Sequence, residues 1–188
     1  MNSMENKELF ELLISDALSL GATRAAVIDV DAVETDAAFR EMCERNACGV
    51  YGKCWTCPPD CGEIGELMEK IRGYDRVLVY QTVGELEDSY DFEGMQEAGS
   101  KHNVLAQRLR VEINKRNINS PLHLGAGGCR VCPVCAKRTD EPCRFPELAM
   151  ASLEAHGINV SKLASAAGMK YINGQNTVTY FGAVFFRD

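Results

Sequence analysis

Apolar residues recur at spacings of three and four in several segments of the chain, which places them on one face of a helix. The clearest N-terminal case covers residues 4–20, where Leu9, Leu13 and Ala17 follow this spacing and Gly21 supplies a stop. The same pattern recurs between the shorter apolar runs. It predicts helices over residues 4–20, 34–44, 62–72, 94–117, 146–156 and 160–167.

Short runs of β-branched and aromatic residues lie between the predicted helices and are typical of buried strands. The clearest is Arg-Val-Leu-Val-Tyr-Gln-Thr-Val at residues 76–83, and an Asn173-Gly174 turn precedes the last run. Strands are predicted over residues 24–30, 76–83, 121–126 and 177–186. Their alternation with helices indicates an α/β or α+β fold, with one mixed sheet of about four strands, helices packed on it and two cysteine-rich metal-binding loops.

Length and composition fit a globular chain that can bury its own core. The 188 residues are 46% hydrophobic and 25% charged. A chain of this length favours a single domain over residues 1–188, with residues 1–90 and 91–188 as candidate lobes.

Charge and hydropathy narrow the partners and the compartment. The net charge of −7 argues against nucleic acid or an anionic membrane as a partner, although Lys137, Arg138 and Arg144 could form a local basic patch. No apolar run is long enough to span a bilayer. Residues 1–16 lack the basic-then-apolar order of a secretory signal, so we expect a cytoplasmic protein.

The nine cysteines carry the strongest chemical signal. Disulfides are rarely structural in the cytoplasm, so a dense cysteine set indicates metal binding or catalysis. Cys48, Cys54, Cys57 and Cys61 form a first set with the spacing C-x5-C-x2-C-x3-C. Glycines and prolines between them supply the turns that bring four thiolates to one centre. The N-terminus of the helix that follows would direct backbone N–H groups toward those thiolates.

A second set consists of Cys129, Cys132, Cys135 and the more distant Cys143, in the pattern C-x2-C-x2-C…C. Zinc sites usually present two separate C-x2-C pairs. Three cysteines in one C-x2-C-x2-C run instead match the bacterial ferredoxin arrangement, in which a more distant cysteine completes an iron–sulfur cluster. The match is partial, because Arg-Phe separates Cys143 from the next proline. Iron–sulfur clusters are preferred here and zinc ions are the alternative.

One cysteine and three histidines lie outside these two sets. Cys43 falls on a predicted helix and is interpreted as a structural thiol, although it could replace Cys48 as a ligand. His102 is expected at the surface of the long helix, and His123 is expected in the core although it could approach the metal. His156 is expected to close the helix predicted before Gly157.

The two cysteine-rich segments resemble a family of microbial proteins described as predicted metal-binding proteins of unknown function. The resemblance covers the chain from about residue 40 onward, and it implies a cytosolic metal protein without specifying a reaction. Many members are expected to have a cysteine upstream of the position of Cys54 instead, which keeps Cys43 in question. The resemblance rests on Tyr51-Gly52, Cys54-Trp-Thr-Cys-Pro-Pro59, Gly128-Cys129 through Cys135, Pro142-Cys-Arg-Phe-Pro146, Leu153 through Val160 and Asn176 through Gly182.

Two four-cysteine sets without a motif for an organic cofactor favour an iron–sulfur protein that binds two 4Fe-4S clusters. We expect it to transfer single electrons as the partner of another redox protein rather than to act as a stand-alone enzyme. One alternative is a zinc-binding protein with two structural sites and an interaction surface. Another is an iron–sulfur enzyme that binds substrate at one cluster, which is less favoured because four cysteines leave no open position. The sequence carries no signal for an oligomeric state.

Both cysteine sets follow a predicted strand or helix and precede a helix that should pack on the same sheet. We therefore expect the two loops at the same edge of the sheet, where electrons could pass between the centres. Loops at opposite edges would instead indicate two independent structural sites.

Overall fold

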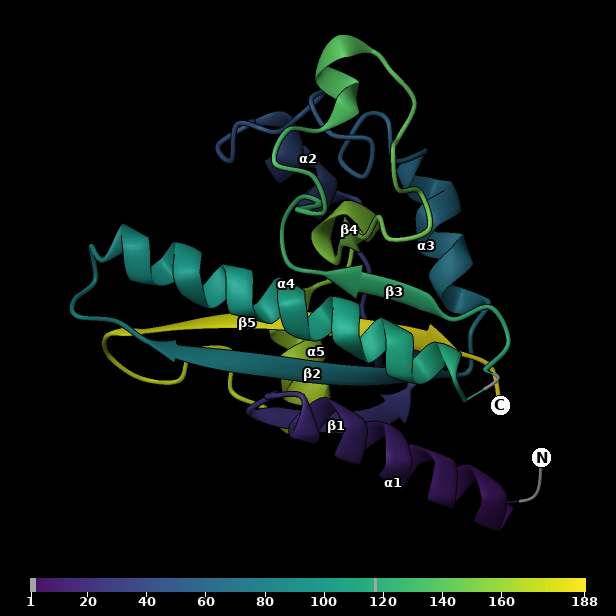
Figure 1. Ribbon diagram of the computed structural model, residues 1–188. Helices are drawn as coiled ribbons and strands as arrows, with labels where there is room; N and C mark the ends of the chain where they lie inside the picture. The colour runs from purple at the N-terminus through teal and green to yellow at the C-terminus, as the bar shows by residue number, and fades with distance from the viewer. Residues whose placement is uncertain (1–2, 117) are drawn as a thin grey trace.

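A computed structural model describes residues 3–116 and 118–188. Within them, five strands form one mixed sheet in the order β1-β2-β5-β3-β4 (Figure 1). The pairs β1–β2, β2–β5 and β5–β3 are antiparallel, and β3–β4 is parallel. The strands are β1 (Arg24–Asp29), β2 (Arg76–Glu85), β3 (Leu122–Gly125), β4 (Ala151–Ser152) and β5 (Thr177–Phe186).

Helices cover both faces of this sheet, so the fold is α+β, within the predicted class (Figure 1). The α-helices are α1 (Ser3–Ser19), α2 (Ala38–Glu44), α3 (Ile64–Arg72), α4 (Phe92–Asn114) and α5 (Val160–Ala166). Short 3-10 helices are η1 (Val30–Ala32), η2 (Ala136–Thr139) and η3 (Glu154–His156). None of the helices in the described ranges combines the length and apolar character needed to cross a membrane.

The interior strand β2, between β1 and β5, is buried on both faces, which explains its continuous apolar sequence. Leu78 and Tyr80 contribute to the core beneath α1 and α4, together with Leu109 of α4. Val77 and Val79 alternate with them and pack on the opposite face, against α3 and α5. The sheet therefore separates two apolar cores.

The remaining elements gather beyond the β3–β4 edge of the sheet. Figure 1 shows α2, α3 and the segments that join them to the sheet above β3 and β4. One long segment connects α2 to α3, and another connects β3 to β4 by way of η2. All nine cysteines lie in or beside these two connections.

The predicted helix over residues 146–156 is wrong. This stretch contains the two residues of β4, which pair in parallel with Leu124 and Gly125, followed by the single turn η3. The Ser152 Oγ accepts a hydrogen bond from the Ala155 N–H at 3.1 Å, an arrangement that competes with a continuous helix. The sequence did not predict strand β4, which brings the sheet to five strands instead of about four.

Two helix boundaries differ from the prediction by more than two residues. Helix α2 begins at Ala38 rather than residue 34 because Thr35 forms a strand-like bridge with Ile158. Helix α4 ends at Asn114, and residue 117, the expected end, lies outside the described residues.

Candidate metal centre

The first cysteine loop, residues 45–63, is folded back on itself by backbone hydrogen bonds. The Gly52 N–H donates to the Pro58 carbonyl at 2.9 Å, and Gly52 has a positive φ of 65°. The Cys57 N–H donates to the Cys54 carbonyl at 2.9 Å, and the Cys61 N–H donates to the Cys57 carbonyl at 3.1 Å. Turns of this kind carry the chain past one region with successive cysteines, as the glycine and proline pattern predicts.

Cys54 and Cys57 are the buried members of the first set, with exposed fractions of 4% and 8%. Their side chains share a hydrogen bond, which lowers the pKa of Cys54 and, together with burial, raises the pKa of Cys57. Cys54 is therefore favoured as the thiolate of the pair, and the thiolate is the form that binds metals.

A positive charge is held beside the first set by Arg40 of α2. Its guanidinium donates to the Gly62 carbonyl at 2.7 Å and to the Ala155 carbonyl at 3.3 Å. Burial raises the pKa of Cys61, and the charge of Arg40 opposes that effect. Sequence reasoning missed Arg40, because its partners lie on segments that only the folded chain brings together.

The second cysteine loop, residues 126–150, brings its four cysteines to one place. Cys129, Cys132, Cys135 and Cys143 line a single small cavity of about 20 Å³. Burial raises the pKa of Cys129, whereas the backbone N–H groups of Val131 and Met150 stabilise its thiolate and oppose the rise. The first three cysteines and the distant fourth therefore belong to one structural cluster.

The two cysteine loops lie against each other, at the same edge of the sheet. The Cys129 N–H donates to the Thr56 Oγ1 at 3.3 Å, and this hydroxyl is 3.4 Å from the Cys54 Sγ. Sequence reasoning expected the loops at one edge, and these contacts confirm it.

Trp55 and Lys137 make further contacts between the two loops, away from Thr56. The Trp55 Nε1 donates to the Glu141 carbonyl at 2.9 Å. The Lys137 Nζ lies 2.9 Å from the Asp60 Oδ1 and 4.4 Å from the centre of the Trp55 ring. The indole side chain beside the first cysteine pair is therefore held by residues of the second loop.

A cavity of about 230 Å³ lies between the two sets. Cys48 and Cys54 of the first set and Cys129, Cys132 and Cys135 of the second line it. The cationic side chains of Lys53, Arg130 and Arg138 line the same cavity. Positive charge thus gathers where thiolates of both sets would add negative charge.

A sequence-family model described as "Predicted metal-binding protein (DUF2284)" matches residues 26–186. The chain belongs to this family. The match confirms the family resemblance, and it supports metal binding without specifying the metal or the number of ions. Comparisons with curated proteins and with solved structures find no match.

The donor chemistry suits the metals that thiolates select. All nine cysteines are free thiols, and soft thiolate ligands select zinc, copper(I) and iron–sulfur clusters. Across residues 3–116 and 118–188, no group of three or more Cys, His, Asp or Glu side chains is arranged around one metal-ion position. The assignment of individual ligands in this family member therefore stays a prediction.

Cys43 lies closer to the first set than its place on a helix suggested. It lines a cavity of about 270 Å³ together with Cys48, Cys57 and Glu154. Burial raises the pKa of Cys43, and the neighbouring Cys48 raises it further. Cys48 is exposed and Cys43 is half-buried, so both alternatives for the fourth position of the first set remain physically accessible.

The histidines are core residues. The prediction that His102 lies at the surface is wrong, because α4 turns it inward, where its Nδ1 lies 2.9 Å from the Thr82 Oγ1 and its ring stacks on Tyr80. His123 is buried on β3, as expected, and His156 ends a helix directly before Gly157, as expected, although that helix is the single 3-10 turn η3.

Proposed function

We propose that the protein binds two 4Fe-4S clusters and transfers single electrons to or from another redox protein. Within this proposal each four-cysteine set holds one cluster. Such a cluster, when bound, accepts or releases one electron at a potential that the surrounding protein sets. The proposed ligands are Cys48, Cys54, Cys57 and Cys61 for one cluster, and Cys129, Cys132, Cys135 and Cys143 for the other.

The spacing of the second set supports iron–sulfur chemistry over zinc, and the cavity supports the assignment of its four cysteines to one centre. The run from Cys129 to Cys135 has the C-x2-C-x2-C spacing that is typical of ferredoxins, whereas structural zinc is usually held by two separated pairs. Cys143 joins those three around one cavity despite its separation in sequence. The fourth thiol completes the four-cysteine ligation that a cubane cluster requires and that zinc would also accept, so the preference for iron rests on the spacing.

The contact between the loops carries the electron-transfer proposal. The Thr56 hydroxyl connects the Cys129 backbone to the Cys54 sulfur, so a proposed ligand of one cluster lies next to a proposed ligand of the other. Two purely structural sites would not need such a contact. An electron carrier benefits from it, because a short path allows one centre to reduce the other.

The residues around the two sets would stabilise the charge of ligated clusters. Arg40 lies beside Cys61, and Lys53, Arg130 and Arg138 line the cavity shared by both sets. Hydrogen bonds and positive charge near cluster sulfurs favour the reduced state and raise the reduction potential. These side chains would thus act on the potential without touching a substrate.

Optical and magnetic spectra of anaerobically purified protein test this function. We expect a brown protein whose visible absorption is bleached by dithionite, and spin–spin interaction between the two reduced centres in the EPR spectrum. Two reduced centres without magnetic interaction would contradict the electron path. A colourless protein that does not respond to dithionite would overturn the whole proposal.

A further inference from the structure

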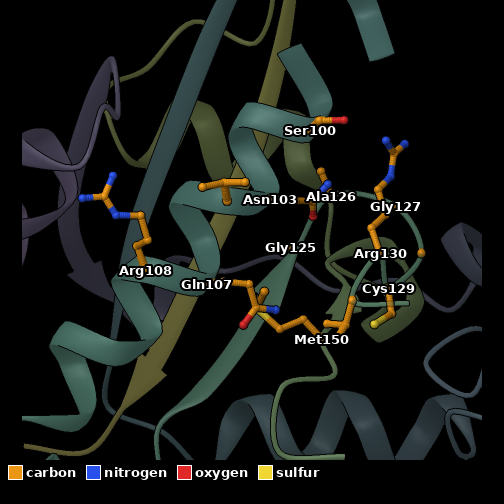
Figure 2. A pocket seen from close by; sticks show the side chains of 13 residues that line it. Ser100, Asn103, Gln107, Arg108, Gly125, Ala126, Gly127, Cys129, Arg130 and Met150 are labelled. Carbon is orange, nitrogen blue, oxygen red and sulfur yellow. The ribbon is translucent and has the colours of Figure 1, made fainter. Parts of the chain in front are cut away.

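A cavity of about 360 Å³ opens between helix α4 and the start of the second cysteine loop, within the size range of small-molecule sites. Figure 2 shows Asn103 and Gln107 of α4 facing the chain from Gly125 to Arg130. Cys129 and Met150 form the wall nearest the second cysteine set. A ligand in this cavity would lie against Cys129.

The charge of the cavity wall is positive although the protein as a whole is acidic. Arg108 and Arg130 line it, and no Asp or Glu does. Neither guanidinium has a hydrogen-bond or ion-pair partner within the described part of the chain, whereas Arg110 on the same helix donates to two backbone carbonyls. Unpaired guanidinium groups bind carboxylates through paired charge-assisted hydrogen bonds.

The amide side chains in the cavity add a second preference. Asn103 donates its Nδ2 to the Gly99 carbonyl at 2.8 Å, and Gln107 donates its Nε2 to the Leu148 carbonyl at 2.8 Å. Because both side-chain NH2 groups are engaged, the side-chain oxygens of Asn103 and Gln107 are left to accept a hydrogen bond from a ligand. Val104, Val131 and Met150 supply the apolar walls.

We infer that this cavity binds a small organic acid that carries both a carboxylate and a hydroxyl donor, such as a hydroxycarboxylate. Figure 2 shows the two arginines on opposite sides of the cavity, so each would hold a different carboxylate of a dicarboxylic hydroxy acid such as malate. The oxygens of Asn103 and Gln107 would accept from the hydroxyl between them. Binding needs only this cavity. The statement that the acid lies beside a redox centre rests on the proposed function, in which Cys129 is a ligand of the second cluster.

Calorimetric titration of the full-length protein under anaerobic conditions tests the inference, with L-malate, succinate and inorganic phosphate as separate probes. We expect L-malate to bind one molecule per chain, and about fivefold more tightly than succinate, which has the two carboxylates but no hydroxyl. No detectable L-malate binding overturns the inference. Phosphate that binds as tightly as L-malate would reveal a general anion site and would equally overturn it.

Arginine variants locate the binding. Arg108→Gln and Arg130→Gln should each weaken L-malate binding by about tenfold, because each removes one charge-assisted contact. Arg24→Gln is the matched control, since Arg24 is exposed on β1 and lies outside the cavity. Equal L-malate affinity in all three variants would place the ligand elsewhere and overturn the inference.

Iron and sulfide content, measured on the same preparations, separates this inference from the proposed function. The arginine variants should keep the metal content of the wild type, because arginine is not a ligand. L-malate binding by a protein that lacks iron would leave the cavity assignment standing and would remove the iron–sulfur proposal alone.

Discussion

The Thr56 side chain accepts a hydrogen bond from the Cys129 backbone although 73 residues separate the two in sequence. Because its oxygen accepts from Cys129, its own proton is free to point at the Cys54 Sγ, 3.4 Å away. The hydroxyl lowers the pKa of Cys54, which is the effect expected of a donor to a thiolate. One threonine thus acts on both cysteine sets.

Thr56→Val removes this hydroxyl while keeping the shape of the side chain. We expect the free energy of unfolding to fall by about 1 kcal/mol, because the Cys129 N–H loses its acceptor. In the loaded protein the reduction potential of the first cluster should become more negative, since the sulfur loses a donor. Denaturant titration and potentiometric titration measure the two effects.

Thr177→Val is the matched control for this change. Thr177 donates to the Gly174 carbonyl at the start of β5, outside both cysteine loops. The Thr177→Val variant should lower the free energy of unfolding by a similar amount and leave the reduction potentials of both clusters unchanged. If Thr56→Val left both potentials unchanged as well, Thr56 would not connect the two sites.

Serine substitutions at the second set test the ligand assignment. Cys129→Ser, Cys132→Ser, Cys135→Ser and Cys143→Ser should each remove about half of the bound metal, because one site is lost and the other is largely spared. The second loop should also become more sensitive to protease, since metal binding is coupled to local folding. Metal analysis and limited proteolysis of each variant measure these effects.

Cys43→Ser is the control for the serine series, and it should keep the full metal content. A lost site in this variant would make Cys43 a ligand and would favour it over Cys48, with which it shares a cavity. Unchanged metal content in all four variants of the second set would show that this set does not bind metal.

Buried histidines predict how stability depends on pH. Burial lowers the pKa of His102 to about 4, of His123 to about 3 and of His156 to about 4. The unfolded chain titrates near its ordinary value of about 6.5 and so binds more protons at mildly acidic pH. The contribution of these three histidines to the free energy of unfolding is therefore fully present above about pH 6.5 and is lost as the pH falls toward 4.

His123→Leu isolates one of these groups. Urea unfolding at pH 7.5 and pH 5.0 should show a smaller loss of stability between the two values in the variant than in the wild type. This comparison cancels acid effects on the cysteines, which both proteins share. The same loss in both proteins would mean that His123 is not held neutral in the fold.

The elements that the sequence predicted well are those whose pattern is set by burial against the sheet. Strands β2 and β5 are long apolar runs, and the spacing in α4 places Leu105 and Leu109 toward the core. The pattern failed over residues 146–156, where apolar residues recur at helical spacing yet pack around β4 and η3 instead. Periodicity cannot distinguish a helix from a short buried segment of this kind.

The cysteine sets could be recognised because their spacing is local, but their surroundings could not. Arg40, Thr56 and Arg110 act on cysteines or loop carbonyls that lie far away in sequence. The one sequence signal for Thr56 was its place between Cys54 and Cys57, from which a hydroxyl can reach a neighbouring sulfur. His102 was expected at the surface of the long helix, and the sequence alone does not show that the sheet covers the face of α4 on which it lies.

Iron, acid-labile sulfide and zinc per chain in anaerobically purified protein test the central claim most directly. Two 4Fe-4S clusters predict about eight iron and about eight sulfide per chain, with zinc below one. Stoichiometric zinc without sulfide would contradict the account and would make both cysteine sets structural metal sites.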